Sequence, residues 1–184
     1  MTPAGGPVRG GRQRLVHRHQ VRADDLAMQG FNFVFRGLTP QNAEEAKQRF
    51  EAALREDPRS LRAWAGVATV AGQTGSLNWM PREAAIARLE EAALHLQQLD
   101  QDDYYTGMSR SFIAFLKGDW ENQLVVATLL AQRFKSHPYP FAEYSKRDPA
   151  YRASSIGTFL RGSDPRFIAG RDLAIETLRE LGLP

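Results

Sequence analysis

The residues of this chain that could carry out acid–base catalysis or hold a metal ion are scattered rather than grouped. Four histidines stand at positions 17, 19, 95 and 137, and no carboxylate cluster accompanies them as further ligands. Asp102 and Asp103 are adjacent and could pair for proton transfer. Acids at the start of a helix, where we place this pair, more often satisfy free backbone N–H groups and the helix dipole. We therefore predict no catalytic residue and no metal site.

Sequence motifs of enzymes are absent as well. The chain contains no G-x-x-x-x-G-K-[ST], G-x-G-x-x-G, G-x-S-x-G or H-E-x-x-H. Its glycines Gly66, Gly72 and Gly75 have no lysine placed to reach a phosphate. The absence of cysteine excludes disulfides, thiolate metal ligands and cysteine nucleophiles, and it is compatible with a reducing cytoplasm. We expect a cytoplasmic protein without catalytic activity or cofactor.

The N-terminal segment is strongly basic. Five arginines and no acid precede Asp24, a charge of +5, so the rest of a chain of net charge +3 carries −2. A flexible arginine tract could bind nucleic acid or an acidic membrane by releasing phosphate counterions. Its glycines and prolines, with few apolar residues to bury, instead favour an arm without regular structure over residues 1–22. Nucleic-acid binding through this arm is kept as the second alternative function.

Apolar residues at helical spacing predict a series of helices over residues 23–136. Ala46, Phe50 and Ala53 share one helical face, and Pro58 ends that helix. An apolar helix containing Trp64 follows directly, and so short a connection requires the two helices to run antiparallel. The same spacing returns 39 residues later in Ala85, Leu89 and Ala92. This internal repeat is longer than the roughly 34 residues typical of tetratricopeptide repeats and shorter than the roughly 40 to 47 typical of HEAT or armadillo units, and both families stack helix pairs.

Capping residues and helix breakers place the boundaries of these elements. We expect the first helix to begin near Ala23 and to close at Gly37, and the second to begin around Thr39 and Pro40. The boundaries that follow are a loop from Gly72 to Asn78, a helix opened by Pro81, a third unit from Asp102 or Asp103, and a turn at Gly118-Asp119.

The last part of the chain is less regular. Pro138 and Pro140 interrupt the helical pattern, so residues 137–163 are predicted to form an irregular linker or a degenerate repeat. Ser163, Asp164 and Pro165 then resemble a capped helix start, which predicts a C-terminal helix over residues 164–184.

These patterns resemble tetratricopeptide repeats (TPR). The segments ADDLAMQG, LTPQNAEEAKQRFEAALREDPRSLRAWAGVA and DPRFIAGRDLAIETLRELGLP are similar to the C-terminal repeat region of bacterial class III adenylate cyclase-like proteins and winged-helix regulators. The resemblance implies an all-α fold, a short right-handed solenoid of antiparallel helix pairs with a C-terminal capping helix. The positions that resemble the repeat signature are Gly30, Phe33, Gly37, Ala46, Phe50, Ala53 and Pro58, then Trp64, Val67, Ala68, Ala71, Ala85, Leu89 and Ala92, with Gln97 in place of the closing proline.

The resemblance also implies a function. In such stacks the first helices of successive pairs line a concave groove that holds a peptide or a partner helix. Arg62 and Arg110 could clamp a carboxylate there, or they could be ordinary solvated arginines on a polar helix face. The residues carried over to the groove are Asp24, Phe31, Arg62, Thr69, Arg110 and Ile113.

Two functions follow from this interpretation. The first is a protein–protein interaction scaffold, whose partner is a protein or a peptide. The alternative is a regulatory or sensor segment of a cyclase-like or transcription-regulator system, although no sequence typical of a cyclase or a winged helix precedes the repeats.

Membrane insertion is not expected, and the repeats leave room for a second copy or another partner. The longest apolar run, from Leu124 to Ala131, is much shorter than the roughly 20 residues that span a bilayer. Only two repeats match well, and a repeat array needs about three to bury its core. We therefore expect a second copy or another partner to cover the apolar residues Phe31, Phe35 and Phe112.

Overall fold

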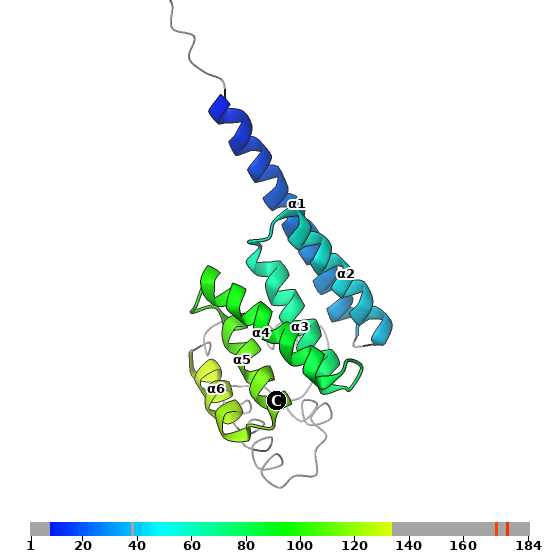
Figure 1. The fold of residues 1–184 in the computed structure, drawn as a ribbon, viewed down its shortest axis with the longest axis vertical. Coiled ribbons are helices and arrows are strands. Elements are labelled where there is room, and N and C mark those ends of the chain that lie inside the picture. Colours follow the sequence, from blue (N-terminus) through cyan, green and yellow to red (C-terminus); the bar gives the residue numbers. More distant parts are fainter. Residues whose placement is uncertain (1–7, 38, 134–171, 173–175, 177–184) are drawn as a thin grey trace, which may run out of the picture. The chain divides into compact units, whose positions relative to one another are not determined.

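The computed structural model describes residues 8–37, 39–133, 172 and 176. These residues are mostly helical and contain no β-strand, so the described part of the chain is all-α, as predicted. Its helices are labelled in Figure 1. They are α1 (Val8–Arg36), α2 (Pro40–Glu56), α3 (Leu61–Ser76), α4 (Arg82–Leu99), α5 (Tyr104–Lys117) and α6 (Trp120–Arg133).

The chain divides into two compact units, and each is described by itself. Unit 1 comprises residues 1–109 and unit 2 comprises residues 110–184. Unit 1 holds the four helices α1 to α4 and the start of α5. The boundary between the units falls within α5.

The helices of unit 1 form two antiparallel pairs, α1 with α2 and α3 with α4 (Figure 1). Helix α3 also packs against both α1 and α2, which places it at the centre of unit 1. Its sequence suits that position because nearly every residue from Ala63 to Gly75 is apolar or small and buried. A helix that is hydrophobic all round can be stable in water only when other elements enclose it.

The repeated apolar spacing marks the buried faces of α2 and α4, as predicted. Ala46, Phe50 and Ala53 of α2 are fully buried, and so are the corresponding residues of α4, which are Ala85, Leu89 and Ala92. The alanines let neighbouring helices approach closely, while Phe50 and Leu89 fill the space between them. Each second helix of a pair therefore contributes large side chains set between small ones to the core, and α4 adds the fully buried Leu96.

The start of α2 follows the predicted signals, and α3 has a cap that was not predicted. Thr39 precedes α2, its hydroxyl accepts a hydrogen bond from the Asn42 N–H at 3.1 Å, and Pro40 takes the first helical position. Ser60 caps α3 in the same way, with its hydroxyl 3.2 Å from the Ala63 nitrogen. These side chains satisfy N–H groups that have no partner within the helix.

The start of the first helix differs from the prediction. Helix α1 begins at Val8, so residues 8–22, expected to form an arm without regular structure, are the first half of a 29-residue helix. No proline interrupts residues 8–36, and arginine and glutamine are good helix formers. His19 and Arg22 also contact α2, which ties this half of the helix to the second. Residues 1–7 lie outside the described residues.

The end of the third helix differs as well. A loop was predicted from Gly72, but α3 continues to Ser76. Gly72 and Gly75 are buried, so these glycines act as small residues in a packed helix rather than as breakers. The chain turns only at Asn78, whose φ of 57° is in the left-handed region that asparagine tolerates.

The described part of unit 2 follows the predicted turn. Helix α5 ends at Lys117, Gly118 has a φ of 73°, and α6 begins at Trp120. Asp119 lies at the start of α6, where its carboxylate accepts from the Asn122 N–H at 3.2 Å. The predicted linker over residues 137–163 lies outside the described residues. So does the predicted C-terminal helix over residues 164–184, apart from Asp172 and Glu176.

Candidate partner-binding site

Two of the predicted groove residues, Asp24 on α1 and Arg62 on α3, lie together. The Arg62 Nη1 is 3.5 Å from the Asp24 Oδ1, and both side chains are about half exposed, 47% and 58%. The pair shows that one side of α1 borders α3. It also means that Arg62 already has a carboxylate beside it within the chain. An exposed pair of this kind contributes little to stability, and a ligand carboxylate would compete with Asp24 for the arginine.

Phe31, a third predicted groove residue, is a core residue. It is 4% exposed, so it does not line an open surface. Its ring meets the ring of Phe50 edge-on with centroids 5.0 Å apart and stacks on Phe35 at 5.7 Å. Tyr105, in the first turns of α5, approaches its other side at 6.1 Å. The favourable geometry of these ring pairs explains why Phe31 turns inward.

The remaining predicted residues do not join a common site in the described structure. Thr69 is half-buried, and its hydroxyl donates to the carbonyl of Ala65 one turn earlier in α3 at 2.8 Å. Arg110 and Ile113 belong to unit 2, where Arg110 is exposed and Ile113 is half-buried. The predicted clamp of Arg62 and Arg110 therefore joins residues of different units, and we describe each in its own unit only.

Helix α1 carries an apolar surface that the sequence reasoning did not identify as a whole. Val21, Met28 and Phe35 are 47%, 48% and 39% exposed, whereas Ala23, Ala27 and Phe31 on the packed face of α1 are buried. They recur every seven residues, which places them in a line along one side of the helix. We call these three residues the α1 stripe. A search for seven-residue spacing between Val21 and Phe35 would have found it.

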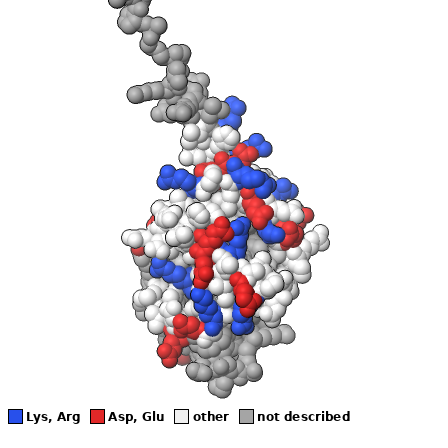
Figure 2. All heavy atoms as spheres, in the orientation of Figure 1, with Lys and Arg blue, Asp and Glu red and all other residues white. Residues whose placement is uncertain are grey.

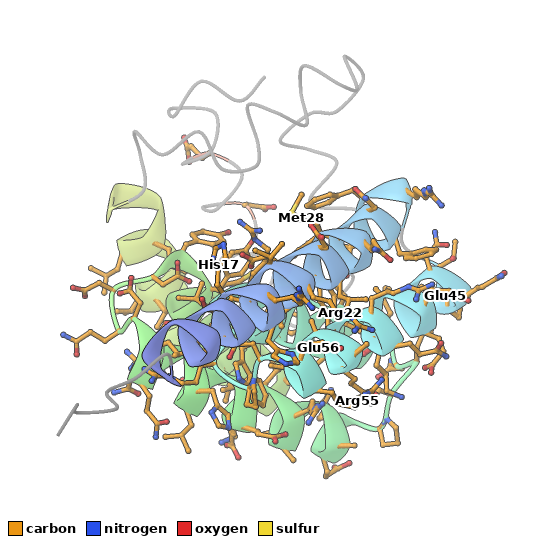
Figure 3. The ribbon with its side chains drawn as sticks, turned by 90° about the horizontal axis from the view of Figure 1, so that it is seen from above. His17, Arg22, Met28, Glu45, Arg55 and Glu56 are labelled. Carbon is orange, nitrogen blue, oxygen red and sulfur yellow. The ribbon has the colours of Figure 1, made fainter. Side chains whose placement is uncertain are left out.

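The α1 stripe lies away from α2. Figure 3 shows Met28 and His17 on one side of α1, while Arg22 points to the other side, toward Glu56 of α2. There the carboxylate oxygens of Glu56 lie 2.9 Å from His19 Nδ1 and 3.0 Å from Arg22 Nε. Helical spacing places Asp24, the partner of Arg62, between the buried face and the stripe. The stripe is thus on the side of α1 that borders α3, where a groove between first helices would run.

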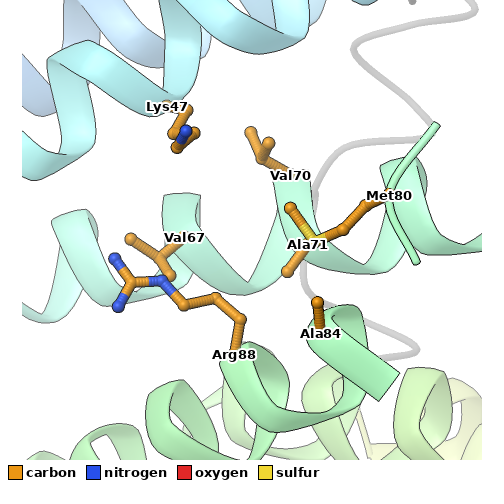
Figure 4. A pocket seen from close by; sticks show the side chains of 7 residues that line it. All are labelled: Lys47, Val67, Val70, Ala71, Met80, Ala84 and Arg88. Atoms are coloured by element: carbon orange, nitrogen blue, oxygen red, sulfur yellow. The ribbon is translucent and has the colours of Figure 1, made fainter. Parts of the chain in front are cut away.

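A small pocket lies elsewhere in unit 1, where α2, α3 and α4 meet (Figure 4). Its volume is about 200 Å³, below the roughly 300 Å³ at which pockets for cofactors and other small molecules begin. Lys47 and Arg88 line the pocket, and both form ion pairs. Lys47 pairs with Glu44 at 3.4 Å, and Arg88 pairs with Glu91 at 2.6 Å. The other lining residues are Val67, Val70, Ala71, Met80 and Ala84. The pocket could hold an apolar side chain.

Charges on this part of the surface are mixed. Arg88 also approaches Glu51 of α2 at 3.6 Å, so cations and carboxylates alternate across α2 and α4. Figure 2 shows Lys and Arg interleaved with Asp and Glu on the face turned to the viewer. Paired surface charges of both signs do not create the single-sign field that attracts a polyanion. This face has no feature that singles out a charged ligand.

Metal-binding clusters are not found in the part of the chain that the structure describes. Among the residues of that part, no group of three or more histidine, aspartate and glutamate side chains is close enough to hold a metal ion. Asp103 accepts a hydrogen bond from the Tyr105 N–H at 2.8 Å, the local role predicted for an acid at a helix start. None of the helices in the described ranges has both the length and the apolar character needed to cross a membrane.

Comparison with known proteins finds no matching family model, no matching curated protein and no matching solved structure.

Proposed function

We propose that this chain is a non-catalytic protein-interaction scaffold, and that unit 1 is a TPR-like pair of repeats in a right-handed solenoid. The succession of antiparallel pairs supports the repeat interpretation, because α3 packs on both helices of the pair before it. The matching buried faces of α2 and α4 support it further. In such an array a partner helix or an extended peptide binds along the first helix of each pair, which here are α1 and α3.

The α1 stripe is the observation that carries this proposal. Single exposed apolar residues are common on protein surfaces, but Val21, Met28 and Phe35 recur every two turns in line on one helix face. Val21 and Phe35 are fourteen residues apart, which corresponds to about 21 Å of helix. A partner helix with apolar residues at i, i+3, i+4 and i+7 could cover that length. The ion pair of Asp24 and Arg62 lies beside the stripe and would supply polar contacts at its rim.

The proposal is tested by removing the stripe without changing the fold. Random peptides displayed on phage are selected on the full-length chain, and the selected peptides are measured on Met28→Lys. Gln29→Lys is the matched control, because it adds the same charge to the neighbouring exposed residue on another face of α1. Far-UV circular dichroism checks that both variants remain helical.

We expect the selected peptides to lose binding to Met28→Lys and to keep it with Gln29→Lys. Lysine at position 28 would place a strongly hydrated ammonium in the centre of the α1 stripe. Peptides that bind the two variants equally well would show that the stripe is not the binding surface.

A further inference from the structure

Helix α1 is longer than the helix it pairs with. It has 29 residues and α2 has 17, and His19 and Arg22 meet Glu56, the last residue of α2. Residues 8–18 therefore extend past the end of α2, as the blue end of α1 does in Figure 1. We call this segment the α1 overhang. Val16 lies in it on the same helical face as the buried Ala23 and Ala27, yet it is 55% exposed.

The α1 overhang differs in charge from the rest of α1. It contains Arg9, Arg12, Arg14 and Arg18 and no acid, and the first acid of the chain is Asp24. The other end of α1 is rich in phenylalanine, with Phe31, Phe33 and Phe35. Along one helix, a basic segment with an exposed valine is thus followed by a segment that carries the stripe and the acids Asp24 and Asp25. A complementary partner would have acids at one end and apolar residues along one face.

We infer that α1 binds an acidic amphipathic helix, whose apolar face covers the α1 stripe and whose carboxylates meet the arginines of the α1 overhang. The inference rests on the proposed function and names the partner of the same surface. Opposite charges at one end would set the direction of the partner helix and speed its encounter with α1. The stripe would supply most of the affinity through apolar burial.

Two other occupants fit these features less well. A nucleic acid would contact the arginines but would leave the α1 stripe exposed to water, because phosphate binding requires no apolar strip. A second copy of the chain would bring a second overhang of the same charge. Two parallel overhangs would repel each other, and an antiparallel arrangement would set each against Arg36 at the far end of α1.

The test uses two synthetic amphipathic peptides of about 18 residues, long enough to cover the stripe and reach the overhang. Both have leucine at i, i+3, i+4 and i+7; one carries glutamates at the end that would face the overhang, and the other carries lysines there. Binding to the full-length chain is measured by fluorescence anisotropy at about 50 mM and about 200 mM salt, which screens exposed charges to different extents. The variants are the double change Arg14→Glu/Arg18→Glu, Met28→Lys and the control Gln29→Lys.

We expect the glutamate peptide to bind at least about tenfold more tightly than the lysine peptide, and the difference to shrink at the higher salt concentration. The Arg14→Glu/Arg18→Glu variant should lose this preference, Met28→Lys should lose binding of both peptides, and Gln29→Lys should behave like the unaltered chain.

Several outcomes would overturn the inference. If the two peptides bind with equal affinity and Met28→Lys weakens the binding of both, the partner is not acidic, but the proposed scaffold function still holds. If Met28→Lys binds these peptides and the phage-selected peptides as tightly as the unaltered chain does, both the acidic partner and the proposed scaffold function are excluded for this surface. Binding of a single-stranded oligonucleotide or of anionic phospholipid vesicles that survives Met28→Lys but not Arg14→Glu/Arg18→Glu would assign the overhang to a polyanion instead.

Discussion

The ring of Phe50 occupies the space that a side chain at Gly66 would need. A Cβ atom on Gly66 of α3 would lie 2.1 Å from Phe50 Cε1, and one on Gly30 of α1 would lie 2.6 Å from the same atom. Phe50 is fully buried, so its ring is the point at which the first three helices meet. Glycine is required on both neighbours because no other residue lets the two backbones come so close to the ring.

Gly66→Ala should therefore destabilise unit 1 by about 1–3 kcal/mol, the usual cost of overpacking a core. The expected sign is informative, because glycine to alanine inside an unconstrained helix is stabilising by about 1 kcal/mol. Urea unfolding followed by circular dichroism measures the change.

The double variant Phe50→Leu/Gly66→Ala supplies the control for this prediction. Leucine lacks the ring, so the added methyl group should cost less in that background, and the two losses should not add. Strictly additive losses, or a gain in stability for Gly66→Ala alone, would show that the ring of Phe50 does not restrict position 66.

Ser60→Ala should lower the free energy of unfolding by about 1 kcal/mol, because the Ala63 N–H would lose its capping oxygen at the start of α3. Ser60 is buried, so water replaces that hydroxyl poorly. The measurement is urea unfolding, with Ser60→Thr as the control that keeps the hydroxyl. Equal stability of Ser60→Ala and the unaltered chain would argue against a capping role.

Glu56→Gln should cost little, less than about 1 kcal/mol, although Glu56 contacts both His19 and Arg22. Both partners are largely exposed, and a carboxylate at the last residue of α2 is disfavoured by the helix dipole. The matched control is Glu45→Gln on the same helix, because no ion pair of Glu45 occurs among the described residues (Figure 3).

Any loss for Glu56→Gln should shrink as salt is added, while Glu45→Gln should not show this dependence. Thermal melts at low and high salt measure both. A large loss that salt does not reduce would mean that Glu56 stabilises the contact between α1 and α2 by more than exposed ion pairing.

The melting temperature of the chain should be the same at two protein concentrations about tenfold apart. The reason is the charge of the α1 overhang, which opposes association of two copies through this helix. Far-UV circular dichroism provides the measurement. A midpoint that rises with concentration would instead indicate that a second copy covers the α1 stripe, the self-association that the sequence analysis also considered.

The sequence alone predicted the all-α class and most helix boundaries of the described residues. This was possible because local signals decide them: Thr39 at a helix start, Pro58 after a helix, Gly118 in a turn, and apolar residues such as Phe50 and Leu89 at helical spacing. The resemblance placed Asp24 and Arg62 in a groove; the structure pairs them at 3.5 Å, and the groove itself stays a prediction.

Tertiary structure decided the rest, because packing between helices overrides local preference. Gly72 was predicted to break a helix, but it is a buried residue inside α3. Phe31 was predicted to line a groove, but its ring packs on Phe50. Whether Met28 is covered or exposed depends on where α2 and α3 lie around α1, which no local pattern encodes. The charge and the apolar spacing of α1 can be read from the sequence alone. Their exposure depends on how the neighbouring helices pack around α1.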